Sequence, residues 1–255
     1  MPDFTPNDLP LNDRIALVVG ASRGIGFETA LALARAGAHV VAAARTQGGL
    51  EELDDAIFAA TGKHATLVPF DLVDGGAIDR LGGAIFERFG RLDIWVQAAA
   101  TMGPSGLTPV SHADPREFAK VEKTNFTGVY RLIRSLEPLL RVSDAGRAIY
   151  LTTSVATAPK AFWGLYAATK AGAEALFKCW ADEIESTPVR ATILDPGRMR
   201  TQMRAQAYPG EDPESVIHPS AIAPLIVELV RSDVQPPLTV SFRDWSAGPT
   251  SAALV

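Results

Sequence analysis

Tyr166 and Lys170, which are four residues apart, are the first residues in this sequence whose types and spacing could do chemistry. On a helix, residues i and i+4 lie on the same face, so the ammonium group and the phenol can share one environment. The unperturbed pKa of tyrosine is near 10, which is too high for efficient proton transfer at neutral pH. A positive charge about 4 Å away is worth roughly 4 kcal/mol at an effective dielectric constant of 20, or up to about three pKa units. The pair therefore predicts a tyrosine able to exchange a proton near neutral pH.

Three consecutive hydroxyl side chains, Thr152, Thr153 and Ser154, stand upstream of this pair. They follow an apolar run that predicts a strand over residues 147–152. Neighbouring residues on a strand face opposite sides of a sheet, so only one of Thr153 and Ser154 can face a substrate unless the strand bulges. Strand alternation alone leaves both open as the partner of Tyr166.

A glycine-rich segment, Gly20-Ala-Ser-Arg-Gly-Ile-Gly26, joins an apolar run over residues 14–20 to a stretch of helical periodicity. At such a junction, the free N–H groups of the helix N-terminus attract phosphate oxygens. We expect Gly20 to form the turn, Gly24 to let the backbone approach a pyrophosphate, and Gly26 to bring the helix close to the sheet. A glycine-rich turn without a ligand is the alternative, and the position of the segment at the first strand–helix junction argues against it.

The end of the second expected strand indicates which dinucleotide would bind. An acidic residue at this place binds the free 2′-hydroxyl of the NAD ribose. Here the chain has Ala43, Ala44 and Arg45, with no carboxylate before Glu51, and the glycine segment adds Arg23. Two guanidinium groups suit the 2′-phosphate of NADP, so we expect NADP rather than NAD. The alternative is that both arginines are solvated surface residues.

The elements that must position these residues alternate along the chain. Strands are expected over residues 14–20, 39–43, 65–70, 92–98, 147–152 and 189–194, and helices over residues 25–36, from 50, 76–90, 115–140 and 164–186. This alternation predicts an α/β fold with a doubly wound parallel sheet and helices on both faces. No repeat or linker interrupts the pattern. We expect a flexible N-terminal arm over residues 1–13 and a single domain over residues 14–255.

Composition excludes several classes of protein. The 255 residues are 47% hydrophobic and 21% charged, as in soluble globular proteins. A net charge of −5 without any basic stretch argues against nucleic acid or an anionic membrane as a partner. No apolar run is long enough for a bilayer, and no signal-peptide pattern opens the chain, so we expect a cytoplasmic protein. One cysteine and four scattered histidines have no ligand spacing, so no metal site is expected.

Together these motifs resemble the short-chain dehydrogenase/reductase family, which has a Rossmann fold. The resemblance runs from about residue 14 to residue 240, and its landmarks are the glycine segment, Asp71-Leu72, Asn125, Tyr166-Ala-Ala-Thr-Lys170, and Pro196-Gly197 followed by Thr201. It implies an oxidoreductase that transfers a hydride between a nicotinamide cofactor and a carbonyl or secondary alcohol. The family usually assembles through its two long helices, which implies a homodimer or homotetramer.

The resemblance also implies roles for individual residues. Tyr166 would donate or accept the proton, Lys170 would lower its pKa and hold the nicotinamide ribose, and Asn125 would help carry a proton-relay water. The family's catalytic hydroxyl lies thirteen residues before the tyrosine, which favours Thr153 over Ser154. The residues expected to bind the cofactor are Gly20, Ser22, Arg23, Gly24, Ile25, Gly26, Arg45, Asp71, Leu72, Ala98, Ala99, Ala100, Tyr166, Lys170, Pro196, Gly197 and Thr201.

The chain departs from the family pattern after the fourth strand, where Gln97–Ala100 replaces the usual Asn-Asn-Ala-Gly. Ala98 removes a side-chain hydrogen bond that braces the sheet. Ala100 would crowd the backbone if its position needed a positive φ. Together with a threonine as the catalytic hydroxyl, these departures leave a second hypothesis open: a non-catalytic NADP(H)-binding or interaction protein that retains the fold.

Substrate contacts are expected from segments that follow the fourth, fifth and sixth strands. They offer mostly apolar and aromatic side chains: Met102, Phe162, Trp163, Leu165, Met199, Met203 and Tyr208. A subunit contact is the alternative use of Phe162 and Trp163. We expect a small carbonyl or alcohol substrate without high charge, covered by a mobile lid over residues 202–217.

Overall fold

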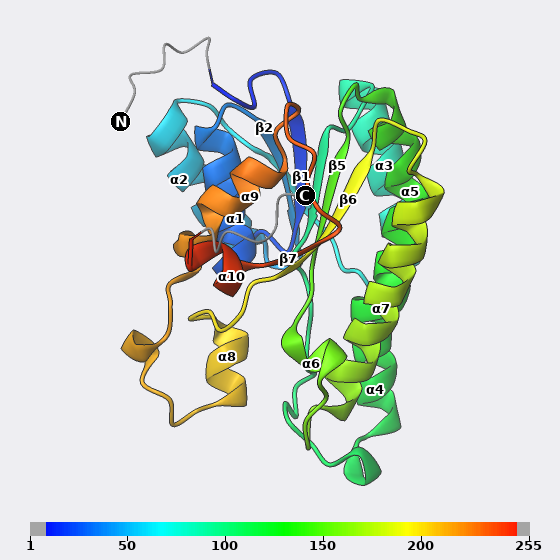
Figure 1. The fold of residues 1–255 in the computed structure, drawn as a ribbon, viewed down its shortest axis with the longest axis vertical. Coiled ribbons are helices and arrows are strands. Elements are labelled where there is room, and N and C mark those ends of the chain that lie inside the picture. Colours follow the sequence, from blue (N-terminus) through cyan, green and yellow to red (C-terminus); the bar gives the residue numbers. More distant parts are fainter. Residues whose placement is uncertain (1–8, 249–255) are drawn as a thin grey trace.

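Seven strands form one parallel sheet at the centre of the computed structural model, which describes residues 9–248 (Figure 1). They are β1 (Ile15–Val19), β2 (His39–Ala44), β3 (Thr66–Pro69), β4 (Ile94–Gln97), β5 (Arg147–Leu151), β6 (Arg190–Asp195) and β7 (Thr239–Ser241). Their order in space is β3-β2-β1-β4-β5-β6-β7, and each neighbouring pair is parallel. The order reverses between β1 and β4, where open α/β sheets bind ligands. The predicted α/β fold with a doubly wound sheet is confirmed.

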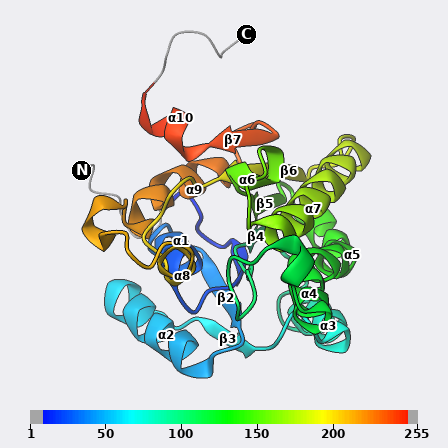
Figure 2. The same cartoon turned by 90° about the horizontal axis from the view of Figure 1, so that it is seen from below.

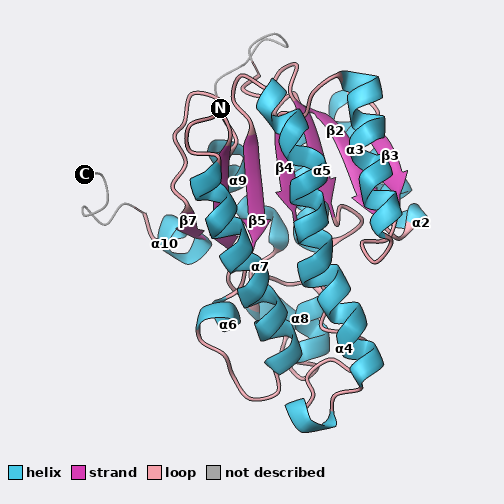
Figure 3. Cartoon of the chain, turned by 90° about the vertical axis from the view of Figure 1, so that its right-hand side faces the viewer, coloured by secondary structure: helices cyan, strands magenta, loops and turns pink. Residues whose placement is uncertain are grey.

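Helices cover both faces of this sheet (Figure 2). They are α1 (Gly24–Arg35), α2 (Gln47–Thr61), α3 (Gly75–Phe89), α4 (Pro115–Glu122), α5 (Gly128–Val142), α6 (Ser154–Thr157), α7 (Gly164–Glu183), α8 (Gln202–Ala207), α9 (Ala223–Leu229) and α10 (Phe242–Ser246). One layer contains α1, α2 and α9, and the other contains α3, α5 and α7. Figure 3 shows α5 and α7 in front of the sheet.

Alternating side chains of each strand pack into the two layers. In β1, Ala16 and Val18 join the core beneath α1, α2 and α9, while Leu17 and Val19 join the core beneath α3, α5 and α7. All four side chains are 1% exposed or less. A strand buried on both faces must be apolar at every position, which is why the strands appear in the sequence as continuous apolar runs.

The long helix expected over residues 115–140 is present but is interrupted. Asp114 caps its start by accepting a hydrogen bond from the Arg116 backbone N–H at 2.8 Å. Between α4 and α5, residues Lys123–Thr127 form a π-helical turn. Such turns insert one extra residue into a helix and occur often at functional sites. This turn contains Asn125, one of the expected site residues.

The fifth strand is one residue shorter than expected. It ends at Leu151, Thr153 has an extended backbone, and Ser154 begins the four-residue helix α6. Strand alternation therefore does not decide between Thr153 and Ser154, because neither residue belongs to the strand. The sequence analysis treated Thr153 and Ser154 as neighbours on a strand, whereas α6 begins almost directly after β5.

The described part of the expected flexible arm is packed. Within residues 9–13, Leu11 is 1% exposed and its backbone N–H donates to the Ala36 carbonyl at 2.9 Å. This turn closes the end of α1, so the expectation of a free arm does not hold for residues 9–13. Residues 1–8 and 249–255 lie outside the described residues.

Two findings concern membrane-spanning helices and metal sites. None of the helices within residues 9–248 is both long and apolar enough to cross a lipid bilayer. Across the same residues, no group of three or more His, Cys, Asp or Glu side chains is arranged to hold a metal ion. The single cysteine, Cys179, is exposed on α7.

Candidate active site

A cavity of about 500 Å³ lies at the carboxyl ends of β1, β2, β4 and β5, at the point where the strand order reverses. This volume is in the usual range of small-molecule sites. The expected site residues that line it are Gly20, Ser22, Arg23, Gly24, Ile25, Gly26, Arg45, Asp71, Leu72, Ala98, Ala99, Ala100, Tyr166, Lys170, Pro196 and Thr201. Four expected residues are not among the lining residues: Asn125, Thr153, Ser154 and Gly197.

The glycine segment packs so closely that side chains would not fit. Gly20 has φ +92°, and a Cβ there would lie 2.6 Å from the Ala99 backbone nitrogen. A Cβ on Gly26 would lie 2.1 Å from the Gly20 carbonyl oxygen. The first N–H groups of α1 therefore lie beside the turn at the cavity, and no side chain caps them. This arrangement fits the pyrophosphate of a dinucleotide, which would accept hydrogen bonds from these N–H groups.

The segment after β4 accommodates its unusual residues. Among the described non-glycine residues, positive φ angles occur at Asp13 and Phe162, and not at Ala100. The crowding expected of Ala100 is therefore absent. Gln97 is 1% exposed, and its amide donates to the Ala99 carbonyl at 3.0 Å, so this side chain braces the turn beside the glycine segment.

Two arginines make one end of the cavity positively charged. Arg23 precedes α1 and Arg45 follows β2, and both side chains are exposed at the lining. Among the described residues, neither forms an ion pair with a carboxylate. Guanidinium groups without a carboxylate partner are free to bind a phosphate.

Tyr166 and Lys170 are buried next to the cavity on one face of α7. The Lys170 ammonium donates to the Leu151 carbonyl and lies 4.0 Å from the ring centroid of Tyr150. Burial lowers the pKa of Lys170 to about 7, against the charge of Glu174, which raises it. The shift gives Lys170 a proton equilibrium close to neutral pH.

The pKa of Tyr166 is raised in the protein by itself, first by burial and then by the charge of Asp195. In the protein by itself, burial outweighs the lowering that the sequence predicted from Lys170. At neutral pH Tyr166 therefore holds its proton and can donate it.

Asn125 joins two parts of the site. Its side-chain oxygen accepts from the Thr101 backbone N–H at 2.8 Å, and its amide donates to the Thr101 carbonyl at 2.8 Å and to the Thr169 hydroxyl at 3.1 Å. The residue is 1% exposed. It thus fixes the segment after β4 against α7, where its partner Thr169 directly precedes Lys170.

The three hydroxyls have three different environments. Thr152 is buried at the cavity wall and donates to Glu174 Oε2 at 2.6 Å. Thr153 is half-buried, and its hydroxyl does not cap α6. Ser154 is exposed. Sequence reasoning missed the pairing of Thr152 with Glu174, although Glu174 stands four residues after Lys170 on the same helical face.

Apolar side chains gather around Tyr166, and Ala100, Met102 and Met203 among them line the cavity. Met102, Val155, Tyr166 and Ala167 form a buried cluster, against which Ala100, Leu107, Trp163, Met203 and Ala207 pack. The ring centroids of Trp163 and Tyr166 are 5.8 Å apart. Met199, expected to contact the substrate, packs instead into the core beneath α1 and α9, and Phe162 is 56% exposed.

Residues 202–217, the expected lid, begin with α8, whose Gln202, Met203 and Gln206 line the cavity. The Gln206 amide donates to the Gly103 carbonyl at 2.9 Å. Arg204 forms two hydrogen bonds of 2.6 Å with Glu211. The first contact joins α8 to the loop after β4, and the second joins two parts of the segment to each other. Thr101 lies in the segment expected to contact the substrate, and further lining residues that the sequence did not identify are Val19, Ala44, Thr46, Phe70, Thr124 and Leu151.

The chain belongs to the short-chain dehydrogenase family, whose sequence pattern matches residues 14–212. It is 35% identical to the "uncharacterized oxidoreductase YciK" of Escherichia coli K12, over 90% of this chain and 91% of that protein. It is 30% identical to 2,3-dihydro-2,3-dihydroxybenzoate dehydrogenase of Bacillus subtilis, over 79% of this chain and 76% of that protein. The protein is therefore an oxidoreductase of this family, as the resemblance predicted.

Solved structures agree with this assignment. A short chain dehydrogenase from Shigella flexneri, complexed with NADP, has a TM-score of 0.87 and 34% identity, covering 92% of this chain and 98% of that chain. One from Escherichia coli CFT073, complexed with NADPH, has a TM-score of 0.86 and 35% identity, with the same coverage. The cofactor in both structures is the one that the sequence predicted.

Proposed function

We propose that this protein is an NADP(H)-dependent oxidoreductase that transfers a hydride between the nicotinamide and the carbonyl or secondary alcohol of a small uncharged molecule. One observation carries the proposal. Tyr166 and Lys170 line the same cavity as the glycine segment and the unpaired Arg23 and Arg45. A proton-transfer pair and a site for a phosphorylated dinucleotide are thus parts of one continuous space.

The chemistry of the lining assigns each part of the cofactor to residues of this chain. Arg23 and Arg45 would bind the 2′-phosphate, and the N-terminus of α1 would bind the pyrophosphate. Pro196 and Thr201 line the cavity together with Tyr166 and would hold the nicotinamide end. The NADP and NADPH complexes of the two solved relatives support this choice of cofactor.

A bound nicotinamide would supply the hydride in reduction and accept it in oxidation. Tyr166 would donate its proton to the carbonyl oxygen in reduction and accept it from the alcohol in oxidation. Its raised pKa keeps the phenol protonated and ready to donate at neutral pH. Lys170 would bind the nicotinamide ribose and stabilise the negative charge left on Tyr166.

The substrate end of the cavity favours an uncharged molecule. The charged lining residues are Arg23, Arg45, Asp71 and Lys170, and all four belong to the expected cofactor site. The rest of the wall includes Met102 and Met203 of the apolar cluster together with the uncharged polar side chains of Thr101, Gln202 and Gln206. A charged group placed against this wall would lose its hydration without a partner.

A turnover screen tests the proposal. Purified protein is mixed with NADPH or NADH and a panel of neutral ketones and aldehydes, and cofactor absorbance is followed. We expect turnover of at least one apolar carbonyl with NADPH and much slower turnover with NADH. Tight NADPH binding without turnover across a broad panel would contradict catalysis and support the alternative of an NADP(H)-binding protein.

A further inference from the structure

A buried carboxylate lies directly behind the Tyr166–Lys170 pair. Tyr166, Lys170, Glu174 and Lys178 follow one another at four-residue spacing on α7, so they occupy one face of the helix. Glu174 is 6% exposed, whereas the side chain of Lys178 is 48% exposed. Glu174 is not among the lining residues of the cavity. The reaction described above does not require it.

Both oxygens of this carboxylate have partners. Oε1 accepts from the Lys178 ammonium at 2.7 Å, and Oε2 accepts from the Thr152 hydroxyl at 2.6 Å. One turn earlier, the Lys170 ammonium donates to the carbonyl of Leu151, the residue before Thr152. Glu174 and Lys170 therefore hold adjacent residues at the end of β5 against α7.

The groups that face Glu174 come from two elements. From α7 they are Lys170 and Lys178, and from the end of β5 they are Thr152 and the Tyr150 phenol. Burial raises the pKa of Glu174, but the hydrogen bonds from Lys178 and Thr152 and the charges of both lysines outweigh it and lower the pKa. Glu174 is therefore ionised at neutral pH, and its charge opposes the loss of the proton from Lys170.

We propose that Glu174 is a positioning residue for the Tyr166–Lys170 pair, because its carboxylate lies one helical turn from Lys170 and holds the Thr152 hydroxyl next to the Leu151 carbonyl that Lys170 binds. A buried carboxylate costs free energy even when it is paired, and an apolar residue of similar size often serves stability as well. A role in positioning Lys170 would explain why a charged residue stands at position 174. The inference rests on the proposed function, in which the Lys170 ammonium binds the ribose and stabilises Tyr166.

Direct titration of Lys170 tests the inference without any substrate. The protein is labelled with ¹⁵N-lysine, the Lys170 signal is assigned with Lys170→Arg, and its pKa is measured in the wild type and in Glu174→Gln. The amide keeps the shape and an acceptor for Thr152 but removes the charge. We expect the pKa of Lys170 to fall by about one unit. Glu174→Met removes the same charge and serves if the amide variant does not fold.

Lys178→Gln is the matched control, because it removes the other charge next to Glu174. Loss of a positive charge cannot lower the pKa of Lys170, so in this variant the pKa should stay or rise slightly. An unchanged Lys170 pKa in Glu174→Gln, or an equal fall in both variants, would overturn the inference.

Affinity for NADPH provides the second readout. As pH rises through the pKa of Lys170, the ammonium is lost and NADPH binding should weaken. In Glu174→Gln this weakening should begin about one pH unit lower than in the wild type. A wild type that never turns over a carbonyl would reject the proposed function yet leave the titration result intact. The two failures are therefore distinguishable.

Discussion

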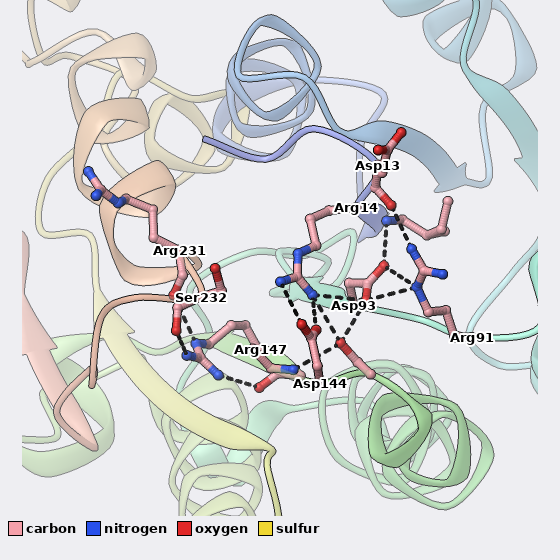
Figure 4. A network of polar contacts seen from close by, with 12 residues as sticks. Asp13, Arg14, Arg91, Asp93, Asp144, Arg147, Arg231 and Ser232 are labelled. Carbon is pink, nitrogen blue, oxygen red and sulfur yellow. Dashed lines mark hydrogen bonds and ion pairs between the residues drawn. The ribbon is translucent and has the colours of Figure 1, made fainter. Parts of the chain in front are cut away.

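The two edges of the sheet treat their polar groups in opposite ways. At the amino edge, where the strands begin, Asp93 is completely buried and accepts hydrogen bonds from Arg14, Arg91, the Ser143 hydroxyl and the Ile15 backbone N–H (Figure 4). At the carboxyl edge, Arg23 and Arg45 line the cavity without a carboxylate partner among the described residues. The buried charge of Asp93 is therefore neutralised within the protein, whereas the charges of Arg23 and Arg45 are left open to a ligand.

The amino edge also satisfies a second buried charge. Arg147, the first residue of β5, is 3% exposed. Its guanidinium donates to the carbonyls of Gly146, Arg231, Ser232 and Val234, which joins β5 to the segment that follows α9 (Figure 4). Burial is the largest cause that lowers its pKa. Buried polar groups that are fully hydrogen-bonded contribute to the stability of the fold.

The difference indicates where the molecule is built for stability and where it is built for binding. A polar group whose hydrogen-bonding capacity is filled within the protein has none left for a ligand. The uncapped N-terminus of α1, the two arginines and the Thr153 hydroxyl retain that capacity. Substitutions at the amino edge should therefore change stability, and substitutions at the carboxyl edge should change binding or rate.

The largest effect at the carboxyl edge should come from Gly26→Ala. The new Cβ would overlap the Gly20 carbonyl, so α1 must move away from the turn and NADPH binding should be lost. The matched control is Gly83→Ala in α3, where a Cβ meets nothing within 4 Å. It should raise stability by about 0.5–1 kcal/mol and leave the NADPH dissociation constant unchanged. Equal NADPH affinity in both variants would contradict the role of the glycine segment.

Asp93→Ala should destabilise the fold by disrupting the polar network at the amino edge. It leaves the guanidinium of Arg14 and the Ile15 N–H without their buried partner, so the free energy of unfolding should fall by about 3–5 kcal/mol. Asp144→Ala removes a carboxylate that also pairs with Arg14 but is 79% exposed, and should cost less than about 1 kcal/mol. Denaturant unfolding measures both, and the NADPH affinity of the folded variants should not change. Weakened NADPH binding in folded Asp93→Ala would contradict the claim that the amino edge serves stability and the carboxyl edge serves binding.

Thr153→Val, at the carboxyl edge, should change the reaction rate and leave stability nearly unchanged. If Thr153 donates to the reacting oxygen, its loss should reduce the rate on the order of 10²-fold with little change in stability. Ser154→Ala should cost much less, since Ser154 is exposed at the start of α6. Steady-state rates with one substrate separate the two variants. The reverse ranking would assign the catalytic hydroxyl to Ser154.

The smallest of these effects concerns the choice of cofactor. NADPH should bind at least about tenfold more tightly than NADH, or about 1.4 kcal/mol. Arg45→Asp replaces the guanidinium by a carboxylate, which should erase or invert that preference because a carboxylate repels the 2′-phosphate and accepts from a free hydroxyl. Calorimetric titration with both cofactors measures it. Equal affinities of the wild type for the two cofactors would contradict the assignment of Arg23 and Arg45.

The fold could be predicted from sequence because each element carries its own signal. Apolar strands alternate with amphipathic helices, and the caps of the helices are local, as Asp114 shows. The fold also brought most of the expected cofactor residues to one cavity, because the carboxyl ends of parallel strands meet at one edge.

What could not be predicted depends on contacts between distant segments. Thr152 pairs with Glu174 across 22 positions of the chain, and no local pattern encodes that distance. The π-helical turn at Asn125 and the short helix after Thr153 shift by one position which side chains face the site. The periodicity of the sequence does not resolve a shift of one position. Burial of Tyr166 decides its pKa in the protein by itself, and the sequence indicates only that Lys170 shares its helical face.

The most direct test of the account is NADPH-dependent reduction of one turned-over carbonyl by Tyr166→Phe, Lys170→Ala and the double variant. Loss of the phenol should reduce the rate about 10²–10⁴-fold while NADPH affinity stays nearly intact, because the hydroxyl transfers the proton. Lys170→Ala should reduce both rate and affinity, and the double variant should be little slower than Tyr166→Phe, because residues that act as a unit are not additive. A Tyr166→Phe protein that reduces the carbonyl at nearly the wild-type rate would contradict the central claim.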